Sequence, residues 1–193
     1  MAARSAQCSS SPDTKEALTK VTLDELDGRI GEAWSGTRPD GSHINLVIAR
    51  RGSPTAAAIV GALGAPRPGH VPFLAVVESG VLVRPITAVV NKVTIGPDPH
   101  GPITWGAAQL GISQGVLDAV SDGLIDPAAA GSLVLLVAVW VDPAAADETA
   151  VRKANRAATR AAIEDAVTDR SADFVRGVTD RREHASNAYY GGS

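Results

Sequence analysis

The sequence predicts one α/β domain, an α+β two-layer sandwich in which a mixed sheet of about four to five strands packs against about three helices. Short segments rich in β-branched residues alternate with segments in which apolar residues recur at helical spacing. The 193 residues are 45% hydrophobic and 20% charged, which is typical of a soluble chain that buries a single core without disulfides.

Strands are marked by their β-branched content and by the turn residues that bound them. Four are predicted, at 42–49, 71–77, 87–95 and 132–141. The segment 28–35 is a candidate fifth strand, which would pair with the strand at 42–49 through the turn "RPDGS" at 38–42.

The first helix is predicted over about 54–63. Ser53 can accept an amide hydrogen bond as its cap, and Pro54 supplies a helical φ at the first position. Gly64 can end this helix.

Two longer helices are predicted in the second half of the chain. Apolar residues keep helical spacing over 102–124, and Gly106, Gly111 and Gly115 within it indicate close packing or a start at Thr104. The other helix is expected from about Pro143 to Val167, with Asp142 as its cap.

The two ends of the chain differ from its middle. Residues 1–20 are polar and aperiodic, so we expect a flexible N-terminal arm, followed by the domain at 21–169. The pattern frays beyond it, and 170–193 is expected to be a weakly ordered tail.

Charge and composition exclude several classes of partner. A net charge of -3 leaves no basic field for nucleic acid. The longest apolar run, 133–141, is too short to span a bilayer, and the N-terminus lacks the apolar core of a secretory signal. The single cysteine, Cys8, has no partner for a disulfide. We therefore expect a cytoplasmic protein that binds neither membrane nor nucleic acid.

Few residues carry a recognisable chemistry. No phosphate loop, nucleophile elbow, dinucleotide fingerprint or pair of histidines at metal spacing is present, so no metal site is expected. His43 and Asn45 share one face of an otherwise apolar strand. This pair of polar residues indicates either a functional site or a face that lies at a sheet edge or in water. Lys92 and Thr94 likewise share a face, where Lys92 is either an anion anchor or a solvated lysine.

Two residues of the predicted helix at 102–124 are candidates for contact with a flat heterocycle. Gln109 can both donate to and accept from an amide-bearing ring, or it can be exposed on the helix. Trp105 can stack on such a ring or fill the core.

Six blocks in register resemble the formaldehyde-activating enzymes of methylotrophs and methanogens, and together they cover about residues 28–167. The blocks are "GSHINLVIARRGSP", "GHVPFLAVV", "NKVTI", "WGAAQLGISQGVLDAVSDGLIDPAAA", "VLLVAVWVDPAAAD" and "NRAATRAAIEDAV". The block "NKVTI" is identical to that of the family, and "SHIN" resembles its "AHID" strand. The head and the tail beyond 169 lie outside the resemblance.

The resemblance implies a fold like that of ribosomal protein S5 domain 2 and a lyase that condenses formaldehyde with tetrahydromethanopterin or a related reduced pterin. It implies that His43 is the acid that helps water to leave. It places the pterin contacts at Asn45, Leu74, Lys92, Thr94 and Gln109.

Three positions depart from the family pattern. Asn45 stands where the family has an aspartate, and Trp105 and Ala107 differ from its "FGPAQ" block. A carboxylate beside His43 would raise the imidazole pKa and favour the acid form, so we expect Asn45 to remove that help.

The resemblance further implies a homopentamer with the pterin between neighbouring subunits. Two alternatives remain open. One is a non-catalytic module that binds or senses a pterin or another small molecule, and the other is an enzyme that uses a different one-carbon acceptor.

Overall fold

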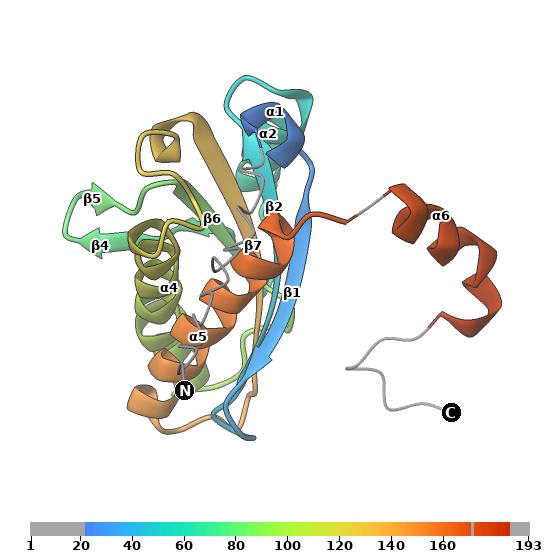
Figure 1. The fold of residues 1–193 in the computed structure, drawn as a ribbon. Helices are drawn as coiled ribbons and strands as arrows, with labels where there is room; N and C mark the ends of the chain where they lie inside the picture. The colour runs from blue at the N-terminus through green and yellow to red at the C-terminus, as the bar shows by residue number, and fades with distance from the viewer. Residues whose placement is uncertain (1–21, 171, 186–193) are drawn as a thin grey trace, which may run out of the picture.

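A five-stranded mixed sheet forms the centre of the computed structural model, which describes residues 22–170 and 172–185 (Figure 1). Its strands, in spatial order, are β1 (Ile30–Ser35), β2 (Ser42–Arg50), β7 (Leu133–Val141), β6 (Ile86–Asn91) and β3 (Phe73–Leu74). β6 and β7 run parallel, and the other neighbours are antiparallel. The predicted fold class is confirmed.

Two long helices, α4 (Gln109–Ser121) and α5 (Glu148–Val167), lie side by side against one face of this sheet (Figure 1). Alternate residues of β2 and β7, such as Ile44, Leu46 and Val137, are fully buried beneath them. The alternation of buried and half-buried residues along these strands therefore reflects one apolar face turned to the helices.

The opposite face of the sheet is covered at one end by α2 (Pro54–Leu63), where Ala56 and Ile59 pack on Ala49 and Val134. Ser53 caps this helix by accepting the N–H of Ala56, as predicted. The other end of that face carries the odd-numbered residues at the start of β2, among them His43.

Two predicted strands are shorter than expected. The segment 71–77 divides at Ala75 into β3 and β4 (Val76–Glu78), and β4 pairs with β5 (Val81–Leu82) in a separate hairpin. The segment 87–95 ends as a strand at Asn91, whose side-chain amide donates to the carbonyls of Gly69 and Val93 and turns the chain. Thr94 is therefore not on a strand face.

The predicted helix at 102–124 is three joined pieces: α3 (His100–Pro102), the π-helical turn η1 (Ile103–Ala108) and α4. A π-turn widens the helix and is frequent at functional sites. Close packing is confirmed for Gly111 and Gly115, where a Cβ would lie 2.3 Å and 2.5 Å from the carbonyl oxygens of Arg152 and Arg156 on α5. At Gly106 the expectation is wrong, because nothing lies within 4 Å of the added Cβ.

The predicted start of the third helix was wrong by five residues. α5 begins at Glu148, where the Asp147 carboxylate accepts the N–H groups of Thr149 and Ala150. Asp142 instead accepts the N–H of Ala144 in a preceding turn. Aspartate at either place is a good cap, so the sequence alone offered two starts.

Short elements complete the described chain. They are α1 (Leu23–Leu26), the 3₁₀ turns η2 (Ala130–Ser132) and η3 (Arg182–His184), and α6 (Ala172–Asp180). α6 falls where we expected a weakly ordered tail, and Figure 1 shows it apart from the sheet. The predicted arm at 1–20, with Cys8, lies outside the described residues. Within the described part, no helix has the length and apolarity needed to cross a bilayer.

The contact between β1 and α5 predicts a strong effect of Gly31→Ala. A Cβ at this position would lie 1.9 Å from the carbonyl oxygen of Ala162, so strand and helix must separate. We expect a loss of about 1–3 kcal/mol of unfolding free energy in urea denaturation.

The matched control is Gly61→Ala in α2, where nothing lies within 4 Å of the added Cβ. It should gain about 0.5–1 kcal/mol because alanine loses less backbone entropy in a helix. Equal stabilities for the two variants would contradict the packing argument.

Candidate active site

The strand register aligns three side chains across the uncovered end of the sheet. Trp34 of β1 pairs with His43 of β2, and His43 pairs with Trp140 of β7, so all three point to the same face. Lys92 follows β6 and continues this row, because its backbone N–H donates to Val139 O at 2.7 Å. Two strand spacings, about 10 Å, separate the backbones of Lys92 and His43, and the two side chains together span this distance.

His43 is held through both ring nitrogens. Its Nε2 lies 2.8 Å from Oε1 of Glu32, and its Nδ1 lies 3.1 Å from Nζ of Lys92. A carboxylate only accepts hydrogen bonds, so this contact favours the imidazole tautomer with its hydrogen on Nε2. In this tautomer Nδ1 accepts the hydrogen bond of the Lys92 ammonium. Glu32 was not predicted as a site residue, because in the sequence it is a single acidic residue within the candidate strand at 28–35.

The three groups shift one another's protonation. Burial lowers the pKa of His43, the Lys92 charge lowers this pKa further, and Glu32 partly opposes both effects. Burial also lowers the pKa of Lys92 to about 8, again against the influence of Glu32. Lys92 is therefore able to release a proton close to neutral pH.

The expectation that Asn45 removes the help of a carboxylate on its own strand stays a prediction, but another carboxylate, that of Glu32, contacts the imidazole. Asn45 does lie on the same face as His43, and its partner across the β1–β2 pair is Glu32. Glu32 supplies the negative charge from the neighbouring strand, since residues directly opposite on two strands share a face.

An aromatic wall stands beside His43. The rings of Trp34 and Trp140 are 5.5 Å apart, and the Trp34 ring is 6.3 Å from that of His43. The Arg38 guanidinium lies 5.1 Å from the centre of the Trp140 ring and 5.9 Å from that of Trp34. This arrangement limits water on one side of the imidazole and places a cation nearby.

A second group of predicted site residues gathers at the β3 edge. Leu74, Trp105 and Gln109, with Val71 and Phe73, line a hollow of about 340 Å³. Trp105 is 47% exposed, so it does not fill the core. An apolar hollow with an amide at its rim suits one end of a flat, polar-edged ring.

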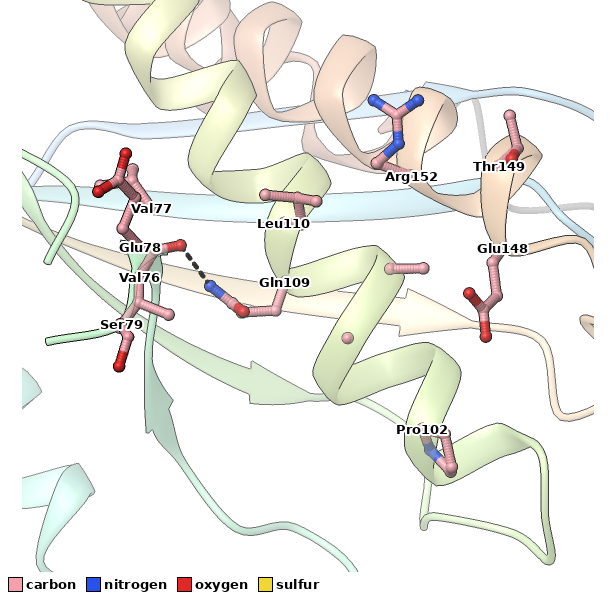
Figure 2. Close-up of a pocket in the computed structure, with 12 residues that line it drawn as sticks. Val76, Val77, Glu78, Ser79, Pro102, Gln109, Leu110, Glu148, Thr149 and Arg152 are labelled. Carbon is pink, nitrogen blue, oxygen red and sulfur yellow. Dashed lines mark hydrogen bonds between the residues drawn. The ribbon is translucent and has the colours of Figure 1, made fainter. Parts of the chain in front are cut away.

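Gln109 also borders a larger open groove of about 560 Å³, which extends past Leu110 to Arg152 on α5 (Figure 2). Its amide nitrogen donates to Val76 O at 2.8 Å and to the hydroxyl of Ser113 at 3.3 Å. The groove thus runs from β4 to α5 with Gln109 on its floor.

Thr94 lies in a third place. Its hydroxyl is 3.3 Å from Nε2 of His70, whose Nδ1 is 2.9 Å from the carbonyl oxygen of Asn91. The structure therefore brings together His43 with Lys92, and Leu74 with Gln109. No hydrogen bond in the described part of the chain joins either pair to the other or to Thr94. Over the same residues, no cluster of three or more metal-ligating His, Cys, Asp or Glu side chains occurs.

Comparison with known proteins decides the family. The family model of the formaldehyde-activating enzyme matches residues 30–189. The chain belongs to the formaldehyde-activating enzyme family. Its match reaches past 169, so the expectation that the tail lies outside the family was wrong.

The chain is similar to two relatives of different length. The 5,6,7,8-tetrahydromethanopterin hydro-lyase of Methanosarcina barkeri is 37% identical over 145 residues, which cover 75% of this chain and 82% of the relative. The bifunctional enzyme Fae/Hps of Methanothrix thermoacetophila is 36% identical over 138 residues, which cover 72% of this chain and 35% of the relative. The chain thus spans about a third of the length of that bifunctional relative.

The contact between His43 and Lys92 makes a prediction for Lys92→Met. Removing the cation takes away one cause of the lowered His43 pKa, so the His43 titration midpoint should move to higher pH. Proton and nitrogen NMR of the histidine rings would follow it, with His43 assigned by its loss in a His43→Gln variant.

Lys153→Met, at an exposed position on α5, is the matched control and should leave the midpoint in place. A midpoint that falls or stays constant in Lys92→Met would show that the two groups do not interact in solution.

Proposed function

We propose that this chain condenses formaldehyde with tetrahydromethanopterin, or a closely related reduced pterin, in one-carbon metabolism and formaldehyde detoxification. The observation that carries the proposal is the placement of His43 between Glu32 and Lys92 at the position of the family's acid. Membership of the family and the printed name of the Methanosarcina relative support the choice of substrates.

The reaction joins the formaldehyde carbon to two amine nitrogens and releases its oxygen as one molecule of water. Both protons of that water come from the two amines, but one of them must reach the oxygen before the C–O bond breaks. A positioned acid contributes about 10²–10⁴-fold to such a step.

His43 is the acid in this proposal, and Nδ1 is the atom that delivers the proton. Nε2 is committed to Glu32, which leaves Nδ1 as the ring nitrogen able to exchange protons. The Lys92 ammonium, 3.1 Å away, can recharge Nδ1. The proton released when the second C–N bond forms can then restore Lys92. This acid step requires no metal.

The remaining residues hold the pterin. Leu74 and Trp105 offer an apolar surface to the flat ring, and Gln109 offers an amide at the rim. Lys92, Thr94 and Asn45 supply polar contacts from the other side, with Asn45 as an uncharged hydrogen-bonding group.

The contacts around Gln109 and those around His43 lie on two different surfaces of one chain, which favours a site shared between copies. Gln109 belongs to the helical layer on one face of the sheet, whereas His43 points from the opposite face. Exposed apolar residues mark the β3 edge and the adjoining helix, including Val71, Leu74, Trp105 and Leu110. We therefore propose a homopentamer in which Gln109 of one copy approaches His43 of the next. A cytoplasmic location remains a prediction from the sequence.

The function predicts the outcome of His43→Ala. With formaldehyde and tetrahydromethanopterin, the wild-type rate should exceed the protein-free rate, and the variant should lose about 10²–10⁴-fold of that excess. His184→Ala, at an exposed position in η3, is the control and should retain the wild-type rate.

Two other outcomes separate the alternatives. A wild-type rate equal to the protein-free rate, with the pterin still bound, would support the binding module in place of the enzyme. A wild-type excess that survives in His43→Ala would reject His43 as the acid.

The shared site makes a prediction for the assembly. Light scattering should give a mass about five times the 19.7 kDa of one chain. Trp105→Glu should lower the mass and the rate together, because a charge in an apolar contact opposes association.

Val60→Glu, at an exposed position on α2, is the control and should keep the wild-type mass. A wild-type mass of a single chain, with full activity, would contradict the shared site.

A further inference from the structure

The backbone of Glu32 is held by the helical layer, although its side chain points to the opposite face of the sheet. Its backbone N–H donates to the Asp165 carboxylate of α5 at 3.1 Å. The preceding Gly31 touches the α5 backbone so closely that no Cβ fits between them. The base of the Glu32 side chain is therefore positioned by strand-to-helix packing.

From this base the Glu32 side chain reaches diagonally across the strand pair. Its Cα faces Asn45, two residues along β2 from His43, yet its Oε1 contacts His43 Nε2 at 2.8 Å. Such diagonal neighbours on one face lie within reach of a long side chain. The contact is therefore a product of the β1–β2 register.

We propose that Glu32 is a positioning residue for the reaction, holding the His43 ring through Nε2 so that Nδ1 alone exchanges the proton. This inference rests on the proposed function and extends it. In this proposal Glu32 makes no contact of its own with the substrate or the departing oxygen. It acts through His43, in the way that carboxylates orient imidazoles in other acid–base sites.

The charges around the ring explain why a carboxylate is needed there. Burial disfavours a positive charge on the imidazole, and the Lys92 ammonium at Nδ1 opposes that charge further. Glu32 contacts the ring at Nε2, and its carboxylate offsets part of both effects. It also favours the protonated form of Lys92, so it supports both the acid and its proton reserve.

The test is Glu32→Gln in the full-length protein, assayed over pH with formaldehyde and tetrahydromethanopterin. Without the carboxylate, His43 and Lys92 both lose protons at lower pH. The high-pH limb of the rate profile should therefore move to lower pH, and the excess rate at pH 7 should fall by at least about tenfold. Glu164→Gln, whose carboxylate pairs with Arg160 on the outside of α5, should leave the profile unchanged.

A second variant distinguishes the effect of the carboxylate charge from a purely structural effect of replacing Glu32. Adding Asn45→Asp to Glu32→Gln returns a carboxylate to the same face, from the opposite strand. The double variant should recover part of the lost rate and move the limb back to higher pH. Asn45→Asp alone should lower the melting temperature without a gain in rate, because it sets two like charges directly opposite.

Two results would overturn the inference. One is an active wild-type enzyme whose pH profile is unchanged by Glu32→Gln, and the other is a double variant no faster than Glu32→Gln. NMR titration of His43 gives an independent readout: Glu32→Gln should lower its midpoint and weaken the preference for a hydrogen on Nε2. If the wild-type protein does not accelerate the reaction, the proposed function fails, and this titration still decides whether Glu32 controls His43.

Discussion

The register between β1 and β2 is the constraint on which the site depends. It sets Trp34 beside His43 and brings Glu32 within reach of the imidazole. A slip by one residue would turn His43 into the helical layer and expose Ile44. The same register is secured by the close contact of Gly31 with α5, so packing on one face of the sheet determines chemistry on the other.

Partial burial changes the protonation of the group formed by Glu32, His43 and Lys92. Removing water from His43 and Lys92 disfavours their charged forms, which brings the pKa of Lys92 to about 8. Glu32 offsets part of this effect. The result is a lysine that can release a proton close to neutral pH, in contact with an imidazole whose pKa is also lowered.

The uncovered end of the sheet and the apolar β3 edge are complementary in chemistry. One carries proton-transfer groups and the other carries Leu74, Trp105 and Gln109. Among the described elements, α2 covers the far end of the face that bears His43, and the side chains around His43 are partly exposed. A site divided in this way links proposed catalysis to proposed assembly.

The sequence by itself determined the alternation of strands and helices, the cap at Ser53, and the candidates His43 and Lys92, because period, caps and motifs are local properties. It did not determine where strand 87–95 ends, since that depends on the Asn91 side chain bonding to distant Gly69. The start of α5 was ambiguous because Asp142 and Asp147 are equally good local caps. Only the tertiary structure made Glu32 the partner of His43, because that contact arises from cross-strand register, which no spacing within either segment encodes.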